Sequence, residues 1–234
     1  MEENKKFFSL TKGVTDQEIR DSLSLLIKNS SPKQEFFVLV VASVMLATFA
    51  IMLDNIPVLI ASMLVAPILY PILTISLGVV INDPVIMSSS IKMVIRSVVF
   101  ALILSTIVAF LFGRQGVSEQ NFIFFSSDLF LSFLTATVSG LIASYGIAHP
   151  RIGGAMPGVA IAVSLIPPLA GIGVGIASLE LLLVRDALAT FIVNIIGIVG
   201  SAIFVFSLFQ FQRHHREIRN MHKKEAAQPD TINI

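Results

Sequence analysis

The sequence has no cysteine and few charged residues. Without cysteine, disulfide bonds, thiolate nucleophiles and cysteine-ligated metals are excluded. Charged residues make up 13% of the 234 residues, whereas soluble domains have about 25%. Hydrophobic residues make up 55%, and the mean hydropathy is +0.86. Most of the chain therefore cannot present a water-facing surface, which predicts an integral membrane protein whose main partner is the lipid bilayer.

Histidine is scarce as well, and enzyme signatures are weak. His149 is the only histidine before the C-terminal tail, and no HExxH or other paired-ligand spacing exists, so no zinc site is expected. The segment 137–140 (TVSG) is similar to the GxSG of intramembrane serine proteases, but its first glycine is missing. We therefore predict no enzyme activity, no catalytic residue, no metal, no cofactor and no nucleic-acid partner.

Two long apolar stretches are interrupted by proline. Residues 56–84 contain Pro67 and Pro71 near their middle, and residues 152–179 contain Pro157, Pro167 and Pro168. Each stretch is long enough to cross a bilayer, which takes about 20 apolar residues. Proline removes a backbone donor and clashes with the preceding turn, so each span should kink or break. Two interrupted spans in corresponding places indicate a transporter-type binding site.

The remaining apolar stretches complete an all-α membrane architecture of about six transmembrane helices. Helices 2 and 5 are the proline-broken ones, and the spans are 36–53, 56–84, 84–112, 129–148, 152–179 and 187–211. Residues 1–35 are predicted to form a cytoplasmic amphipathic segment with no signal peptide, and residues 212–234 a basic and polar cytoplasmic tail. The transmembrane domain is thus residues 36–211.

The two halves of this domain resemble each other. Sliding the sequence by 97 positions lays Pro71 on Pro168, Gly78 on Gly175 and Asp83 on Glu180. Each half, 36–112 and 129–211, consists of a plain span, a broken span and a long span. Because three is an odd number, the second copy must enter the membrane upside down. This predicts two inverted repeats, with a site at their interface near the midplane.

Basic residues are distributed unevenly around the spans. With both termini cytoplasmic, fourteen of the sixteen Lys and Arg residues fall on the inside, and only Arg114 and Arg185 fall outside. The positive-inside rule therefore predicts the cell inner (cytoplasmic) membrane with both termini in the cytoplasm. Lys92 and Arg96 lie one turn apart near the start of a span, where they are expected to snorkel, to anchor anionic headgroups or to contact a substrate.

A stripe of small residues follows one face of the span 129–148. Ala136, Gly140, Ser144 and Ala148 recur at four-residue intervals. Such a stripe lets two helices approach closely, so it predicts a packing seam either within the chain or between the subunits of a homo-oligomer.

Three segments carry a resemblance to a known family. Residues 61–67 (ASMLVAP) with Pro71 and Gly78, residues 154–175 (GAMPGVAIAVSLIPPLAGIGVG) and residues 194–197 (NIIG) resemble the signatures of domain-of-unknown-function 389, a hydrophobic family of bacteria and archaea. The resemblance covers about residues 36–211 and implies an integral membrane protein, but it implies no substrate. Some members carry extra soluble domains, which this sequence is expected to lack.

The polar groups in the predicted midplane are uncharged. No Asp, Glu, Lys, Arg or His falls there, which disfavours a carboxylate-based proton antiporter. The predicted substrate-binding residues are therefore the broken segments and nearby polar side chains: Pro67, Tyr70, Pro71, Thr74, Ser164, Pro167, Pro168 and Asn194. We predict a secondary transporter or channel for a small ion or solute. The alternatives are a membrane scaffold or sensor subunit, prolines that only kink helices, and an Asn194 that only bridges helices.

Overall fold

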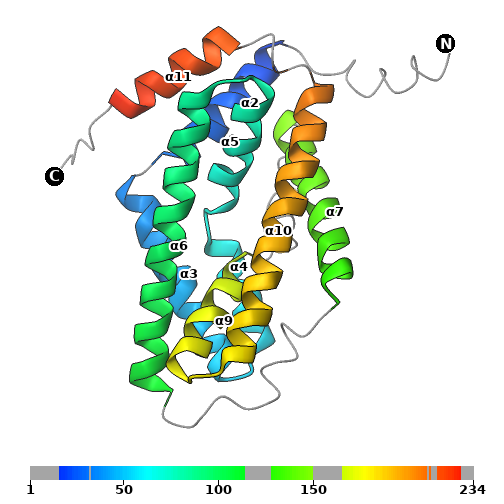
Figure 1. Ribbon diagram of the computed structural model, residues 1–234. Helices are drawn as coiled ribbons and strands as arrows, with labels where there is room; N and C mark the ends of the chain where they lie inside the picture. Colours follow the sequence, from blue (N-terminus) through cyan, green and yellow to red (C-terminus); the bar gives the residue numbers. More distant parts are fainter. Residues whose placement is uncertain are drawn as a thin grey trace.

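The computed structural model describes residues 16–31, 33–113, 128–149, 165–209, 211 and 215–227, and within these it is helical with no strand. The helices pack into a bundle with α2 and α11 at one end (Figure 1). Their bounds are α2 Asp16–Asn29, α3 Gln34–Met52, α4 Ile56–Val65, α5 Leu69–Val80, α6 Pro84–Phe112, α7 Leu129–Ala148, α9 Ile166–Ala177, α10 Leu181–Leu208 and α11 His215–Ala227.

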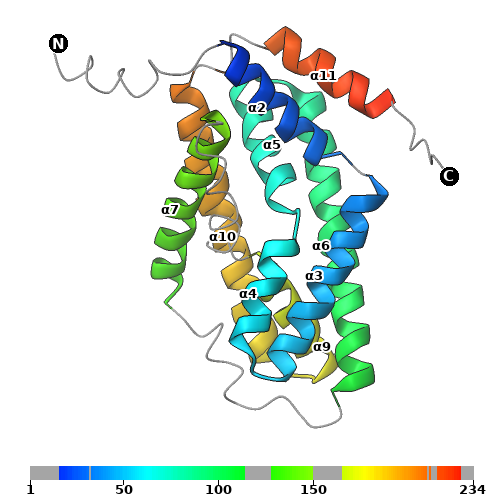
Figure 2. The same ribbon diagram turned by 180° about the vertical axis from the view of Figure 1, so that it is seen from behind.

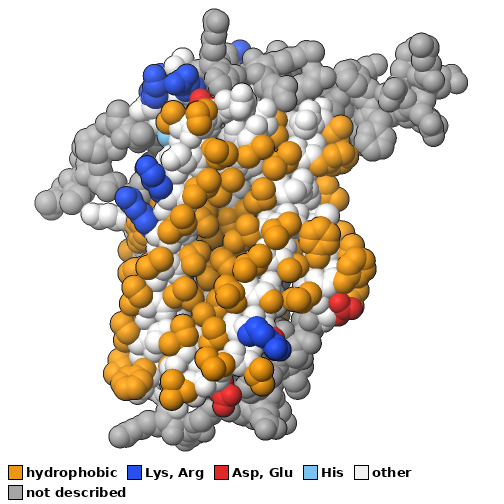
Figure 3. Space-filling view, viewed as in Figure 1, with side chains coloured by type: hydrophobic (Ala, Val, Ile, Leu, Met, Phe, Trp, Pro, Cys, Tyr) orange, Lys and Arg blue, Asp and Glu red, His pale blue; other side chains and the backbone are white. Residues whose placement is uncertain are grey.

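The helices have the length and surface of membrane spans. Within the described residues α3, α6, α7 and α10 are each long and apolar enough to cross a membrane, and α4 with α5 makes a fifth candidate that is bent by 50°. The bundle exterior is apolar (Figure 3), with Ile95, Ile107 and Ile196 each at least half exposed. Soluble proteins rarely expose so continuous an apolar surface, so the described chain has the character of an all-helical membrane protein. The predicted span 152–179 lies partly outside the described residues.

The first broken span divides where its sequence requires. The Asn55 side chain caps α4 by accepting a hydrogen bond from the Val58 N–H at 3.1 Å, and α4 ends at Val65. Ala66 is extended (φ −73°, ψ 122°), because a residue that precedes proline avoids the helical region. Pro71 was also expected to break the helix, and that prediction is wrong. It lies in the first turn of α5, where its missing N–H has no intrahelical partner to lose.

Two helical hairpins, α5–α6 and α9–α10, share their turn geometry. Both α5 and α9 have 12 residues. In the turns, the Asp83 N–H donates to the Gly78 carbonyl at 3.0 Å and the Glu180 N–H to the Gly175 carbonyl at 2.8 Å. The glycines are required by close approach: a Cβ at Gly78 would lie 2.9 Å from the Met87 nitrogen. A Cβ at Gly175 would likewise lie 2.8 Å from Val184 Cγ2. In each hairpin a glycine therefore lets the two helices approach closely, and the two glycines are 97 residues apart.

The small-residue stripe of α7 packs against α10 within the chain. Ala136 and Ser144 are buried, and a Cβ at Gly140 would lie 2.8 Å from the Ile198 Cα. The stripe therefore forms a packing seam within the chain, which is one of the two alternatives predicted from the sequence. The Ala136/Gly140/Ser144 face is consequently covered, and a homo-oligomer would have to use another surface.

Candidate functional site

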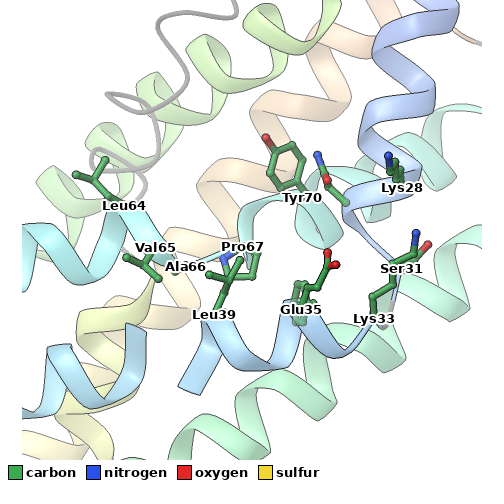
Figure 4. Close-up of a pocket in the computed structure, with 12 residues that line it drawn as sticks. Lys28, Ser31, Lys33, Glu35, Leu39, Leu64, Val65, Ala66, Pro67 and Tyr70 are labelled. Carbon is green, nitrogen blue, oxygen red and sulfur yellow. The ribbon is translucent and has the colours of Figure 1, made fainter. Parts of the chain in front are cut away.

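A cavity of about 330 Å³ lies beside the break between α4 and α5. The break contributes residues 64–67 and α5 contributes Tyr70, while the opposite wall comes from the junction of α2 with α3. That junction supplies Lys28, Lys33 and Glu35 (Figure 4). A volume of this size is at the lower end of the range for small-molecule sites. The cavity is therefore large enough for a small solute.

The backbone at the break brings two opposite helix ends to the cavity. Pro67 has no N–H, so the Met63 carbonyl has no donor four residues ahead in the chain. The neighbouring Ser62 carbonyl is satisfied from another helix, since the Ser43 hydroxyl donates to it at 2.7 Å. At the start of α5, Ile68 provides no side-chain cap. The negative C-terminal end of α4 and the positive N-terminal end of α5 thus meet at this wall.

Charged side chains face this dipolar wall. Lys28 and Glu35 are exposed and Lys33 is half-buried, and Glu35 projects from the first turn of α3 toward the side on which Tyr70 lies (Figure 4). Two ammonium groups, one carboxylate and a phenol give the cavity donors and acceptors of both charge signs. This set suits a small ion or a solute that carries charge.

A second, smaller cavity of about 30 Å³ lies under α11, and apart from Ile27 its lining residues carry polar side chains. The hydroxyls of Ser30 and Thr74 are hydrogen-bonded to each other at 2.6 Å. The other polar lining residues are Ser31, Ser89, Ser90 and His222. The space fits about one water molecule. Burial lowers the pKa of His222 below its usual value of 6.5, and the negative charge of Asp83 partly opposes that effect.

The structure distributes the predicted site residues over several places. Pro67 and Tyr70 line the larger cavity and Thr74 lines the smaller one. Pro71 is buried within α5, and Pro167 with Pro168 is buried at the start of α9. Asn194 is buried in α10 and belongs to neither cavity wall. Ser164 lies outside the described residues. Since α4 packs against α9, parts of the two broken segments are neighbours.

Sequence reasoning missed the charged wall of the cavity. Lys28, Lys33 and Glu35 belong to residues 1–35, which were predicted to be a cytoplasmic amphipathic segment and were given no part in the binding site. The signal that points to its docking is the apolar face of α2, whose Leu23, Leu26 and Ile27 are buried where α2 packs on α5.

Comparison with known proteins places these features in a family. Residues 63–200, which include the α4–α5 break and both hairpin turns, match the family described as Domain of unknown function (DUF389). The chain belongs to the DUF389 family. The DUF389 chain is also 31% identical over 199 residues to an uncharacterised protein of Methanocaldococcus jannaschii. That match covers 85% of this chain and 60% of the relative. No solved structure matches this DUF389 chain.

Proposed function

We propose that this protein is a secondary transporter or channel for a small ion or solute, with its binding site at the α4–α5 break. The observation that carries the proposal is the cavity of about 330 Å³, where two half-helix ends and charged side chains converge beside an apolar bundle. Backbone that is irregular at membrane depth occurs where it is buried in protein or lines a water-filled cavity, and half-helix ends are a recurring way to bind ions and charged solutes.

An inverted-repeat architecture agrees with this role. The hairpins α5–α6 and α9–α10 share lengths, turns and glycine contacts at an offset of 97 residues. Their packing is reciprocal as well, since α6 packs on α9 and α10 packs on α5. We propose 36–112 and 129–211 as the two repeats of a six-span fold, with residues 152–179 as the fifth span. Rocking of one repeat against the other would open the site alternately to the two sides.

Charge supports an orientation in which the end with α2 and α11 is cytoplasmic. Apart from Arg185, the described basic residues lie at that end or on the half of α6 nearer to it, whereas Asp54, Asp128 and Glu180 lie at the turns of the opposite end. By the positive-inside rule, we propose that both termini are cytoplasmic and that the protein lies in the cell inner membrane. The cavity wall formed by the α2–α3 junction lies toward that cytoplasmic end.

A scaffold or sensor subunit is the second candidate function. It is favoured by one observation: α2 and α11 pack on each other and form a layer outside the spans (Figure 2). Partners could dock on such a layer without any solute crossing the membrane.

The test begins with a thermal-shift screen of the purified protein against ions and small metabolites, followed by flux measurements in proteoliposomes with each compound that binds. Lys33→Gln and Tyr70→Phe should weaken binding about tenfold or more, because each removes a polar contact from the cavity wall. Arg185→Gln at the opposite end, where Arg185 pairs with the adjacent Asp186 at 2.8 Å, is the matched control and should bind normally. If a compound binds but no flux is measured, the second candidate function, a scaffold or sensor subunit, is favoured over a transporter or channel.

A further inference from the structure

Two cations lie on the apolar exterior of α6. Lys92 and Arg96 are one helical turn apart and exposed. The exposed large hydrophobic residues Ile91, Ile95 and Val99 flank them on the same helix. No acidic side chain among the described residues pairs with either cation. Uncompensated charge on a lipid-facing surface is costly away from the interface, so the depth of these residues decides what they contact.

Two independent observations place them at the edge of the hydrocarbon. A core of about 30 Å takes about 20 helical residues, and counting back from the exposed Phe112 at the far end of α6 reaches about residue 93. Ring contacts then fix the register of α3 along α6: Phe37 with Phe100 at 6.3 Å and Phe49 with Phe112 at 5.7 Å.

This register puts the start of α3 level with Arg96. The start of α3 is polar, with Lys33, Gln34 and Glu35, so it must lie outside the hydrocarbon as well. Helical side chains tilt toward the helix N-terminus, so Lys92 and Arg96 both reach toward the headgroups.

A second pair of cations, Lys223 and Lys224, lies on α11, which packs near the start of α6. The Arg219 Nε lies 3.7 Å from the Asp83 Oδ2. Asp83 is 2% exposed and caps the start of α6 by accepting hydrogen bonds from the Val85 and Ile86 N–H groups. This contact fixes α11 over the first turn of α6. One turn further along α11, Lys223 and Lys224 are exposed, and no described acid pairs with them. Figure 3 shows basic side chains at two levels of this face, at the α11 end and further along α6.

We propose that this face binds an anionic phospholipid. Its phosphate and acidic headgroup lie between Lys92 and Arg96 on α6 and Lys223 and Lys224 on α11, and its acyl chains follow Ile91, Ile95 and Val99. The headgroup layer is about 5–7 Å thick on each side of the core, and the two cation pairs lie below and above it. A phospholipid accounts for the charge and for the apolar flank together, whereas a free phosphate would account only for the charge. The site does not depend on transport.

The test measures binding of a fluorescent phosphatidylglycerol to the full chain in neutral detergent by anisotropy. A cation near an anionic headgroup contributes about a fivefold change in affinity. Lys92→Gln with Arg96→Gln should therefore weaken binding about 25-fold, and Lys223→Gln with Lys224→Gln should do the same. The charge-preserving pair Lys92→Arg with Arg96→Lys should retain binding, and so should the distant Arg185→Gln. Unfolding midpoints measured without lipid identify any variant that is misfolded.

Several outcomes would overturn the proposal. Equal affinity for phosphatidylcholine would show that charge is not recognised. Displacement of the probe by inorganic phosphate at concentrations similar to those of unlabelled phosphatidylglycerol would indicate a free-anion site. If both double glutamine variants are folded and bind phosphatidylglycerol with unchanged affinity, the four assigned cations do not form the lipid site.

Discussion

Asn82 and Leu179 have nearly the same left-handed backbone, with φ of 53° and 60°, at equivalent positions of the two hairpins. Each lies two residues beyond the end of a 12-residue helix and precedes an acidic residue, Asp83 or Glu180, at the start of a long helix. Asparagine tolerates this conformation, whereas a branched aliphatic side chain is strained in it. The turn geometry is thus common to both hairpins although their side chains differ.

Replacing these two residues should change stability in opposite directions. Leu179→Asn should raise the free energy of unfolding by about 1 kcal/mol, because it relieves a left-handed leucine, and Asn82→Leu should lower it by a similar amount. Leu179 is 87% exposed, so its replacement removes little packing. Unfolding in mixed detergent micelles measures both changes, and the same sign for both variants would contradict the backbone explanation.

The glycines at the hairpin contacts provide a second stability test. Gly78→Ala and Gly175→Ala should each destabilise the protein by about 1–3 kcal/mol, since the new methyl group meets the facing helix. Gly200 is the matched control, because it lies within α10 and a Cβ there has no neighbour within 4 Å. Gly200→Ala should stabilise by up to about 1 kcal/mol. A similar effect from all three substitutions, measured by thermal unfolding, would show that close packing is not the cause.

Asn194 distinguishes a structural polar group from a solute ligand. It is buried in α10 away from both cavity walls, so Asn194→Leu should lower the free energy of unfolding by about 1–3 kcal/mol through the loss of buried hydrogen bonding. Affinity for any solute found in the screen should not change in the folded fraction. If Asn194→Leu instead weakens solute binding without changing stability, Asn194 contacts the solute as the sequence predicted.

Docking of α11 should weaken as the pH falls. Burial lowers the pKa of His222 in the folded protein below 6.5, so the undocked helix binds more protons. The stabilisation is fully present above pH 6.5 and is lost as the pH falls through the folded pKa. Besides the hydroxyls of the small cavity, His222 is near Asp83, whose charge reduces the effect, and Arg219 lies on its own helix.

Spin labels report this docking directly because the chain has no native cysteine. The pair Gln17→Cys and Asn220→Cys, on the adjacent helices α2 and α11, should give a longer distance population at pH 5.5 than at pH 7.5. Adding His222→Gln should make the distribution independent of pH over that interval. A shift that persists in the glutamine variant would assign the pH response to another group.

The sequence predicted features that are set by local chemistry. Apolar runs predicted the four long apolar helices and the bent α4–α5 pair, Pro67 predicted the break, and the 97-residue offset aligned Gly78 with Gly175. Pro71 was misread because the effect of a proline depends on where the next helix begins, which propensity does not determine. Lys28, Lys33 and Glu35 could not be assigned to the cavity, because their position depends on the docking of α2 against α5, far along the chain.

The Asp83–Arg219 contact joins residues 136 positions apart in the chain, and it therefore sets an order of events during synthesis. The turn that contains Asp83 leaves the ribosome roughly 130 residues before Arg219 has been synthesised. During that interval the carboxylate of Asp83 can be hydrated, and the turn can pass into or out of the bilayer surface without its final partner. When α11 emerges and docks, the turn is closed after the intervening spans have been inserted. Closure of this contact thus marks the completed assembly of the bundle.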